Sequence, residues 1–126
     1  MSLISPLNRV IGLGSAKGGT EHWWLQRLTA VALVPLGLWL LFSLAAIDTS
    51  SYSAVAEWVR RPMTGVLLLA TIIIVVYHSW LGIQVVFEDY AAGRAKVVVL
   101  ILSTFGHALI GIAAGYFILR IAFGTA

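Results

Sequence analysis

Two histidines lie inside long apolar stretches of this sequence, His78 and His107. An ionisable side chain deep in an apolar segment is costly, so it usually faces the interior of a helix bundle and has a function. At about 1.5 Å of helix rise per residue, His78 lies roughly 16 Å from Asp89, where its stretch ends. Neutral imidazole commonly ligates haem iron. It can also hydrogen-bond across helices as packing, or relay protons, and depth alone leaves these three readings open for His78.

His107 lies at a similar distance into the last apolar stretch, so the two histidines should share a depth. An intrachain haem ligated by both histidines is geometrically conceivable, with small residues nearby leaving room for a flat cofactor. The alternatives are that His107 hydrogen-bonds within the helix bundle, or that it meets a polar face of a neighbouring chain.

Polar residues gather where the apolar stretches end. Glu88, Asp89 and Tyr90 follow the second stretch, and acids with a tyrosine are ordinary at a membrane interface. A tyrosine hydroxyl supported by a carboxylate could also donate a hydrogen bond to a quinone carbonyl and help to deliver protons. Taken alone, the interfacial interpretation of this segment is favoured.

The first stretch is preceded by the segment 21–27, which carries two tryptophans suited to anchoring at the interface. Arg27 could extend to lipid headgroups in the same way. A sharper hypothesis is that Arg27 and His22 pair with an anionic cofactor group such as a haem propionate, because arginine offers a fork of N–H donors.

The composition indicates that these residues belong to a membrane protein. Of 126 residues, 60% are hydrophobic and 10% are charged, and the mean hydropathy is +0.98. One small domain cannot bury that much apolar surface, so much of it must face lipid. The absence of cysteine excludes disulfides and thiolate metal sites. The net charge of +3 has no basic run behind it, so nucleic-acid binding is excluded.

Charge-free runs predict an all-α integral membrane protein with three transmembrane helices in an antiparallel bundle. The expected spans are 28–47, 63–87 and 97–120, within a single membrane-anchor domain over 1–126 whose residues 1–26 form an extended N-terminal tail. Between the first two spans, Tyr52, Val55 and Val59 recur at helical spacing opposite charged residues, which predicts a short interfacial helix. Gly93 is available as a helix breaker in the second connection.

Orientation follows from the distribution of basic residues. The tail and the second connection hold five of them, against three on the other side: Arg9, Lys17, Arg27, Arg94 and Lys96 against Arg60, Arg61 and Arg120. The positive-inside rule therefore favours a cytoplasmic N-terminus by a small margin.

Two segments together resemble a known family. The segment from His78 to Tyr90 fits the pattern H-x(3)-G-x(6)-D-Y of the hydrophobic membrane anchor, the D subunit, of succinate dehydrogenase (complex II). The segment from His22 to Arg27, the three-span layout and the length are similar to that family as well. The resemblance covers most of the chain.

The resemblance implies specific roles. In that family the anchor pairs with a second three-helix subunit and the two hold one haem b, with one histidine ligand from each. His78 matches the ligand position, so His107 is not expected to be a ligand. Asp89 and Tyr90 match the pair that borders the ubiquinone pocket, and Arg27 matches an arginine expected near the haem propionates.

The resemblance therefore predicts the anchor subunit of a succinate:ubiquinone oxidoreductase that docks an iron–sulfur subunit and a flavoprotein subunit. Alternatives are an anchor of a fumarate reductase or another quinone-linked b-type cytochrome and, from a different class, a small proton-linked transporter protomer. A purely structural anchor without a redox role is a further alternative. The short chain without a transit peptide favours a bacterial inner membrane.

Overall fold

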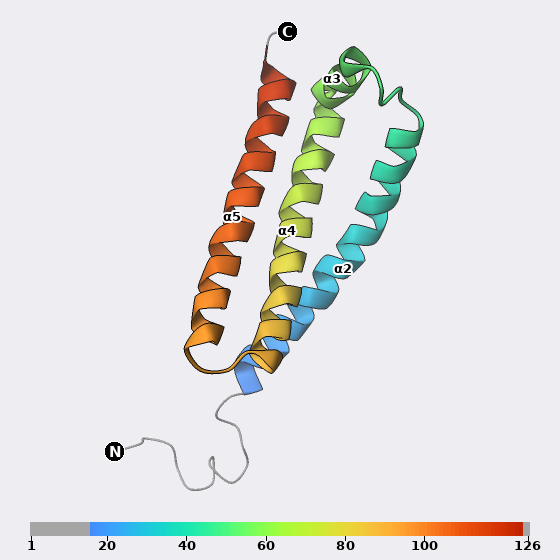
Figure 1. Cartoon of the computed structure of the whole chain (residues 1–126). Helices are drawn as coiled ribbons and strands as arrows, with labels where there is room; N and C mark the ends of the chain where they lie inside the picture. The colour runs from blue at the N-terminus through green and yellow to red at the C-terminus, as the bar shows by residue number, and fades with distance from the viewer. Residues whose placement is uncertain (1–15, 125–126) are drawn as a thin grey trace, which may run out of the picture.

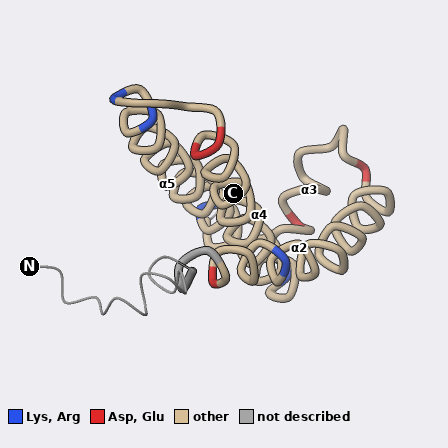
Figure 2. The backbone as a smooth tube through the Cα atoms, turned by 90° about the horizontal axis from the view of Figure 1, so that it is seen from below, with Lys and Arg blue, Asp and Glu red and all other residues tan. Residues whose placement is uncertain are grey.

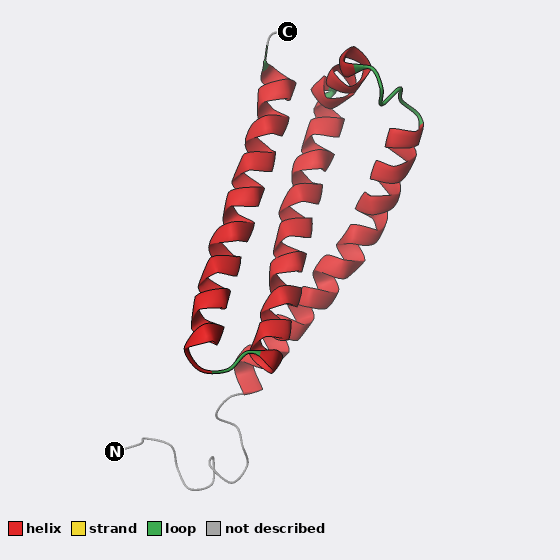
Figure 3. Ribbon diagram, in the orientation of Figure 1, coloured by secondary structure: helices red, strands yellow, loops and turns green. Residues whose placement is uncertain are grey.

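The computed structural model describes residues 16–124, and α-helices account for nearly all of them. The helices are α2 (Ala16–Ala45), α3 (Tyr52–Arg60), α4 (Pro62–Tyr90) and α5 (Gly93–Phe123), joined by short loops (Figures 1 and 3). Three segments are long and apolar enough to cross a membrane: Thr20–Ala45, Pro62–Tyr90 and Gly93–Phe123. The 29 residues of α4 extend about 43 Å, which exceeds the roughly 30 Å hydrocarbon core. The predicted all-α membrane fold with three spans is confirmed.

Helix boundaries differ from the prediction at the start of the first span. α2 begins at Ala16, inside the segment 1–26 that was expected to be an extended tail. Charge-free runs mark only the part of a helix that lies in hydrocarbon, and a helix continues through the interface because its backbone groups remain paired there. The part of the predicted tail over 1–15 lies outside the described residues.

The long helices form an open row with α4 in the middle. α4 packs against both α2 and α5, whereas α2 and α5 do not contact each other within the described part of the chain. Figure 1 shows α5, α4 and α2 in succession, and Figure 2 shows the same order from below, with charged residues near the helix ends. A side chain on α4 therefore faces one of two separate seams, α2/α4 or α4/α5.

The row leaves most large apolar side chains of the single chain exposed, such as Val31 at 69% and Ile112 at 71%. Contiguous apolar surface of this extent is untenable in water. Lipid or other subunits must cover it.

The predicted interfacial helix is present as α3. It buries Ala56, Trp58 and Val59, and Trp58 stacks on Trp39 of α2 with ring centroids 6.0 Å apart. Tyr52 begins the helix and is 78% exposed in the single chain. α3 thus closes the end of the row opposite to the start of α2.

Basic side chains cap the ends of two of the long helices. Arg60 donates to the carbonyls of Ile121 and Gly124 at 3.4 and 3.3 Å, and Lys96 donates to Glu88 O at 2.9 Å. Positive charge at a helix C-terminus satisfies its free carbonyls and opposes its negative dipole end. These contacts hold α5 to α3, and the start of α5 to the end of α4.

The α4–α5 connection is tight because of one glycine. Gly93 has φ +61°, a backbone conformation that side chains other than glycine rarely adopt. The predicted breaker at Gly93 is therefore confirmed, and the two helices run antiparallel as expected (Figure 1).

Candidate functional site

His78 lies on α4 and faces α2, where two polar side chains meet its ring. Thr29 Oγ1 is 2.8 Å from His78 Nδ1, and Gln26 Nε2 is 3.5 Å from His78 Nε2. Thr29 is almost fully buried, at 9% exposure, whereas His78 is half-buried. Neither Thr29 nor Gln26 was predicted as a site residue. Both follow His22 at helical spacing, and that spacing of polar residues at the start of an apolar run could have identified them.

The two ring nitrogens of His78 differ in the quality of their contacts. The Nδ1 contact has the length of a good hydrogen bond, whereas a nitrogen–nitrogen separation of 3.5 Å is at the limit for one. Nε2 is therefore the nitrogen that a ligand could approach, once the Gln26 amide moves aside.

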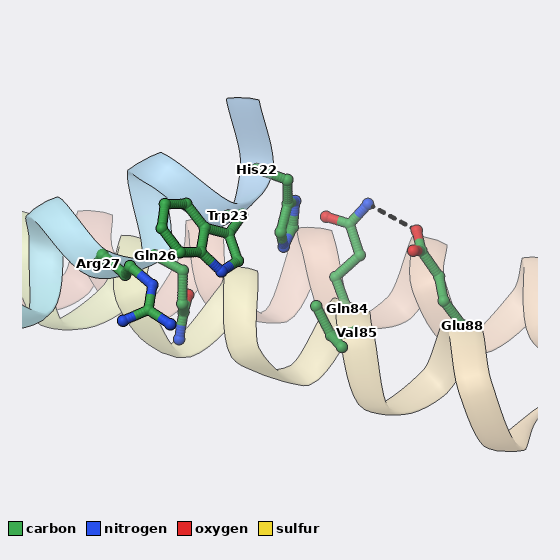
Figure 4. A pocket seen from close by; sticks show the side chains of 7 residues that line it. All are labelled: His22, Trp23, Gln26, Arg27, Gln84, Val85 and Glu88. Atoms are coloured by element: carbon green, nitrogen blue, oxygen red, sulfur yellow. Dashed lines mark hydrogen bonds between the residues drawn. The ribbon is translucent and has the colours of Figure 1, made fainter. Parts of the chain in front are cut away.

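A pocket of about 670 Å³ opens between the first turns of α2 and the last turns of α4. His78 does not line it, and Gln26, which does, is the residue that connects the pocket to His78. Figure 4 shows its side chains, with Arg27 at one end, Glu88 at the other, and the two glutamines between them. The lining residues are His22, Trp23, Gln26, Arg27, Gln84, Val85 and Glu88.

Within the pocket, the groups predicted to meet an anion already have partners. His22 Nε2 lies 3.1 Å from Leu81 O, where it donates to the α4 backbone, and the Arg27 guanidinium lies 4.1 Å from the centroid of the Trp23 ring. The cation–π contact leaves the N–H edge of Arg27 available for an acceptor. The structure thus places Arg27 and His22 in one pocket but engages the Nε2 of His22 in helix packing.

Two buried acceptors of the pocket lack a partner among the described residues: Gln26 Oε1 and Gln84 Oε1. Gln84 turns its amide nitrogen to Glu88 Oε1 at 3.0 Å, which directs its oxygen away from that carboxylate (Figure 4). Buried acceptors without partners are costly and mark places where a donor on a ligand, a partner chain or a water is expected.

Asp89 and Tyr90 lie at the end of α4 and are exposed, with Tyr90 at 87%. Neither lines the pocket, whose outer wall on α4 is formed by Glu88 instead. No hydrogen bond joins their side chains to other described residues. The structure therefore keeps the predicted quinone pair apart from the Arg27 pocket, on an open surface at the same end of the molecule.

His107 belongs to the other seam. Its Nδ1 donates to Ser103 O at 2.7 Å, and Ser79 of α4 lies 3.2 Å from its Nε2. Nδ1 is bonded within α5 and Nε2 is engaged across the seam to α4, while His78 faces α2. The intrachain haem with two histidine ligands is therefore wrong for this arrangement, and hydrogen bonding within the bundle describes His107.

The histidines and acids of the described residues restrict the kind of metal site that this chain could form. Within residues 16–124, no group of three or more histidines or acids could hold a metal ion. A site using His78 would therefore draw on at most one further histidine or acid of the described residues, and His107 lies on the other seam.

Sequence comparison identifies the family. Residues 1–111 match the family described as succinate dehydrogenase/fumarate reductase transmembrane subunit. The chain belongs to that family. Membership in a family of oxidoreductase subunits favours the electron-transfer reading over the transporter alternative.

Relatives in this family carry a consistent name. The chain is similar to the succinate dehydrogenase hydrophobic membrane anchor subunit of Paracoccus denitrificans, at 32% identity over 99% of this chain and 97% of the relative. It is 46% identical to the protein of the same name from Rickettsia bellii over 61% of this chain, an alignment that spans 62% of the relative. A membrane anchor subunit from Reclinomonas americana is 35% identical over 68% of this chain and 73% of the relative. No solved structure matches the chain.

Proposed function

We propose that this chain is the membrane anchor subunit of a succinate:quinone oxidoreductase, in which it ligates haem b through His78 and borders the ubiquinone site with Asp89 and Tyr90. The observation that carries the proposal is the geometry of His78. It is the one histidine of α4, held at Nδ1 by Thr29 and weakly contacted at Nε2, in a family of oxidoreductase membrane subunits.

The residues around His78 fit a haem with one ligand from this chain. A ligating histidine needs one nitrogen free to bind iron and the other held by an acceptor, and His78 has this arrangement once Gln26 withdraws. When bound, haem b supplies a one-electron redox site inside the membrane. Any further histidine ligand would come from a second three-helix subunit, because His107 is engaged in the α4/α5 seam.

Arg27 and His22 would face the propionate side of the cofactor. Arg27 is supported by its contact with Trp23 and retains free N–H donors in the pocket. His22 contributes chiefly by holding the start of α2 to Leu81 of α4. With the Nε2 hydrogen given to Leu81 O, the Nδ1 of the neutral ring is an acceptor, so Arg27 would be the donor to the propionate.

Tyr90 and Asp89 would form one wall of the quinone site. The Tyr90 hydroxyl would donate a hydrogen bond to a quinone carbonyl, and Asp89 beside it would accept and return protons at the membrane surface. Their exposure in the single chain supports this role, because a site shared between subunits must be open on each of them.

The end of the molecule that carries Tyr90 would face the cytoplasm of a bacterium and dock the iron–sulfur and flavoprotein subunits. Lys17, Arg27, Arg94 and Lys96 lie on this side, in agreement with the positive-inside rule. Succinate oxidation itself would take place on those partners.

The quinone role is tested by Tyr90→Phe in the purified complex. Loss of one substrate hydrogen bond, about 0.5–1.5 kcal/mol, should lower quinone reduction about 2- to 10-fold. Succinate oxidation with an artificial acceptor should be unchanged, because it bypasses the membrane site. Tyr52→Phe is the matched control, since Tyr52 is also exposed but lies at the opposite end. Unchanged quinone turnover in Tyr90→Phe would remove Tyr90 from the site.

The haem role is tested by His78→Ala, which should abolish or alter the low-spin b-haem spectrum of the complex. His107→Ala is the control and should leave the spectrum in place. The opposite pattern would assign the ligand to His107.

A fumarate reductase anchor is the second candidate, because the family description covers both enzymes. The relatives named above are all succinate dehydrogenase subunits, which favours the first candidate. The midpoint potential of the native quinone decides between the two directions.

A further inference from the structure

The Thr29 hydroxyl makes three short contacts on the buried seam between α2 and α4. Its Oγ1 lies 2.8 Å from Leu25 O, 3.0 Å from Gln26 O and 2.8 Å from His78 Nδ1. A hydroxyl has one proton and two lone pairs, whereas a carbonyl oxygen can only accept. When the Thr29 proton goes to a carbonyl, a lone pair of Oγ1 faces His78, and Nδ1 must carry the hydrogen of that bond.

The position of the hydroxyl is set by α2 itself. Threonine in a helix can turn its Oγ1 back to the carbonyl of the preceding turn, and its β-branched side chain has few rotamers. The contact with Leu25 O is of this kind. The acceptor for His78 is therefore held by the backbone of α2, and α2 supplies it to a residue of α4.

We propose that Thr29 is a positioning residue for His78, which it holds in the tautomer with hydrogen on Nδ1 and a lone pair on Nε2. This inference rests on the proposed function in one respect only: the group that the free Nε2 would bind is the haem iron. The tautomer and its dependence on Thr29 are properties of this chain alone.

Gln26 completes the arrangement on the other nitrogen. Its amide nitrogen, a donor, is the group that faces Nε2, as a lone pair there requires. At 3.5 Å this contact is weak, and the amide is the end of a flexible side chain, so it can withdraw when iron approaches. Thr29 orients the ring, and Gln26 occupies the ligand position until then.

A hydrogen bond from the ligand's far nitrogen makes the imidazole a better donor to iron, and loss of such a partner typically weakens metal affinity 10- to 100-fold. Ferric iron benefits more than ferrous iron from a basic ligand. Removing the acceptor should therefore raise the haem midpoint potential. The rise is about 59 mV for each tenfold by which the affinity for ferric iron falls more than the affinity for ferrous iron.

Three variants separate positioning from packing. Thr29→Val removes the hydroxyl and keeps the shape, and Thr29→Ser restores the acceptor. Thr71→Val is the matched control, because Thr71 is equally buried on α4 and donates to Leu67 O four residues back, with no bond to His78.

The first readout is nitrogen NMR of the full chain, labelled at histidine, without haem in lipid nanodiscs, with the His78 signals assigned by loss in His78→Ala. We expect protonated Nδ1 and unprotonated Nε2 in the wild type, in Thr29→Ser and in Thr71→Val, and a shift toward the other tautomer in Thr29→Val. Protonated Nε2 in the wild type would overturn the proposal even if Thr29→Val failed to fold, and so would an unchanged tautomer in Thr29→Val.

The second readout is the midpoint potential of the b-haem in the purified complex. A rise in Thr29→Val with wild-type values in Thr29→Ser and Thr71→Val supports positioning, whereas equal potentials in all variants contradict it. If the haem spectrum does not depend on His78, the haem assignment of the proposed function fails, and the NMR result still decides the role of Thr29.

Discussion

Gly82 lies one turn after His78 on α4 and next to the Gln26 amide of α2. A Cβ added at Gly82 would lie 3.3 Å from Gln26 Nε2, closer than ordinary van der Waals contact. The amide is the end of a flexible side chain, so in Gly82→Ala it should move by a few tenths of an ångström while the helices stay in place. Its separation from His78 Nε2 is already 3.5 Å, so any movement that lengthens this distance removes the contact.

Two terms decide the effect of Gly82→Ala on stability. Alanine is more favourable than glycine inside a helix by about 0.8–1.0 kcal/mol. Loss of one hydrogen bond costs about 0.5–1.5 kcal/mol, and this long bond belongs at the lower end. The terms nearly cancel, so the free energy of unfolding should change by less than about 0.5 kcal/mol.

The assay is reversible unfolding of the reconstituted chain, with Gly37→Ala and Gly106→Ala as controls. A Cβ at either control position meets nothing within 4 Å, so both variants should show the helix-propensity gain undiminished. A loss above about 2 kcal/mol in Gly82→Ala would refute the reasoning, because it would mean that the amide cannot move and that α2 and α4 separate instead.

Three further predictions concern the opposite end of the molecule. Trp58→Ala should destabilise the chain by about 3–5 kcal/mol because Trp58 is 7% exposed, whereas Trp24→Ala, at 62% exposure, should have little effect on unfolding. Arg60→Met should cost about 1 kcal/mol, because it removes the side chain that caps α5, and faster hydrogen exchange of the last turn of α5 would report it. Hydrogen bonds from Ser50 hold the pKa of Asp48 below its usual range, so the turn they form should persist above about pH 4 and loosen as the pH falls further, which an NMR titration of the loop can follow.

Each of these three predictions would be contradicted by a specific result. Equal destabilisation by the two tryptophan variants would mean that burial in α3 does not decide the loss. Unchanged exchange at the end of α5 would show that water caps it as well as Arg60 does. A carboxyl of Asp48 that titrates at or above its usual pKa would mean that the Ser50 bonds are absent in solution.

The sequence predicted the elements well and their ends less well. Runs free of charge identify the segments that lie in hydrocarbon, because a charge there is costly and its absence can be read directly from the sequence. The same criterion misses helix that continues into the interface, which is why α2 begins at Ala16 rather than after residue 26. Periodicity found α3, but which of its residues are buried, Ala56, Trp58 and Val59, depends on how the helix packs against the rest of the chain.

The candidate site was predictable only in its most unusual residues. His78 stands out because an imidazole within a span is rare, and Asp89–Tyr90 because they complete a family pattern. Thr29, Gln26 and Gln84 are ordinary near a span, so their part in the site depends on which seam they face.

What the sequence alone determined is one-dimensional: the apolar runs, the depth of His78 along its helix, the family pattern and the charges at the ends. These depend on composition and spacing along the chain. The tertiary structure decided that α4 lies between its neighbours, so that His78 faces α2 while His107 faces Ser79 across the other seam. It also decided which nitrogen of His78 is held and that Tyr90 stays open at the surface. Such properties depend on how helices rotate against one another, and that rotation is set by packing between residues far apart in the chain.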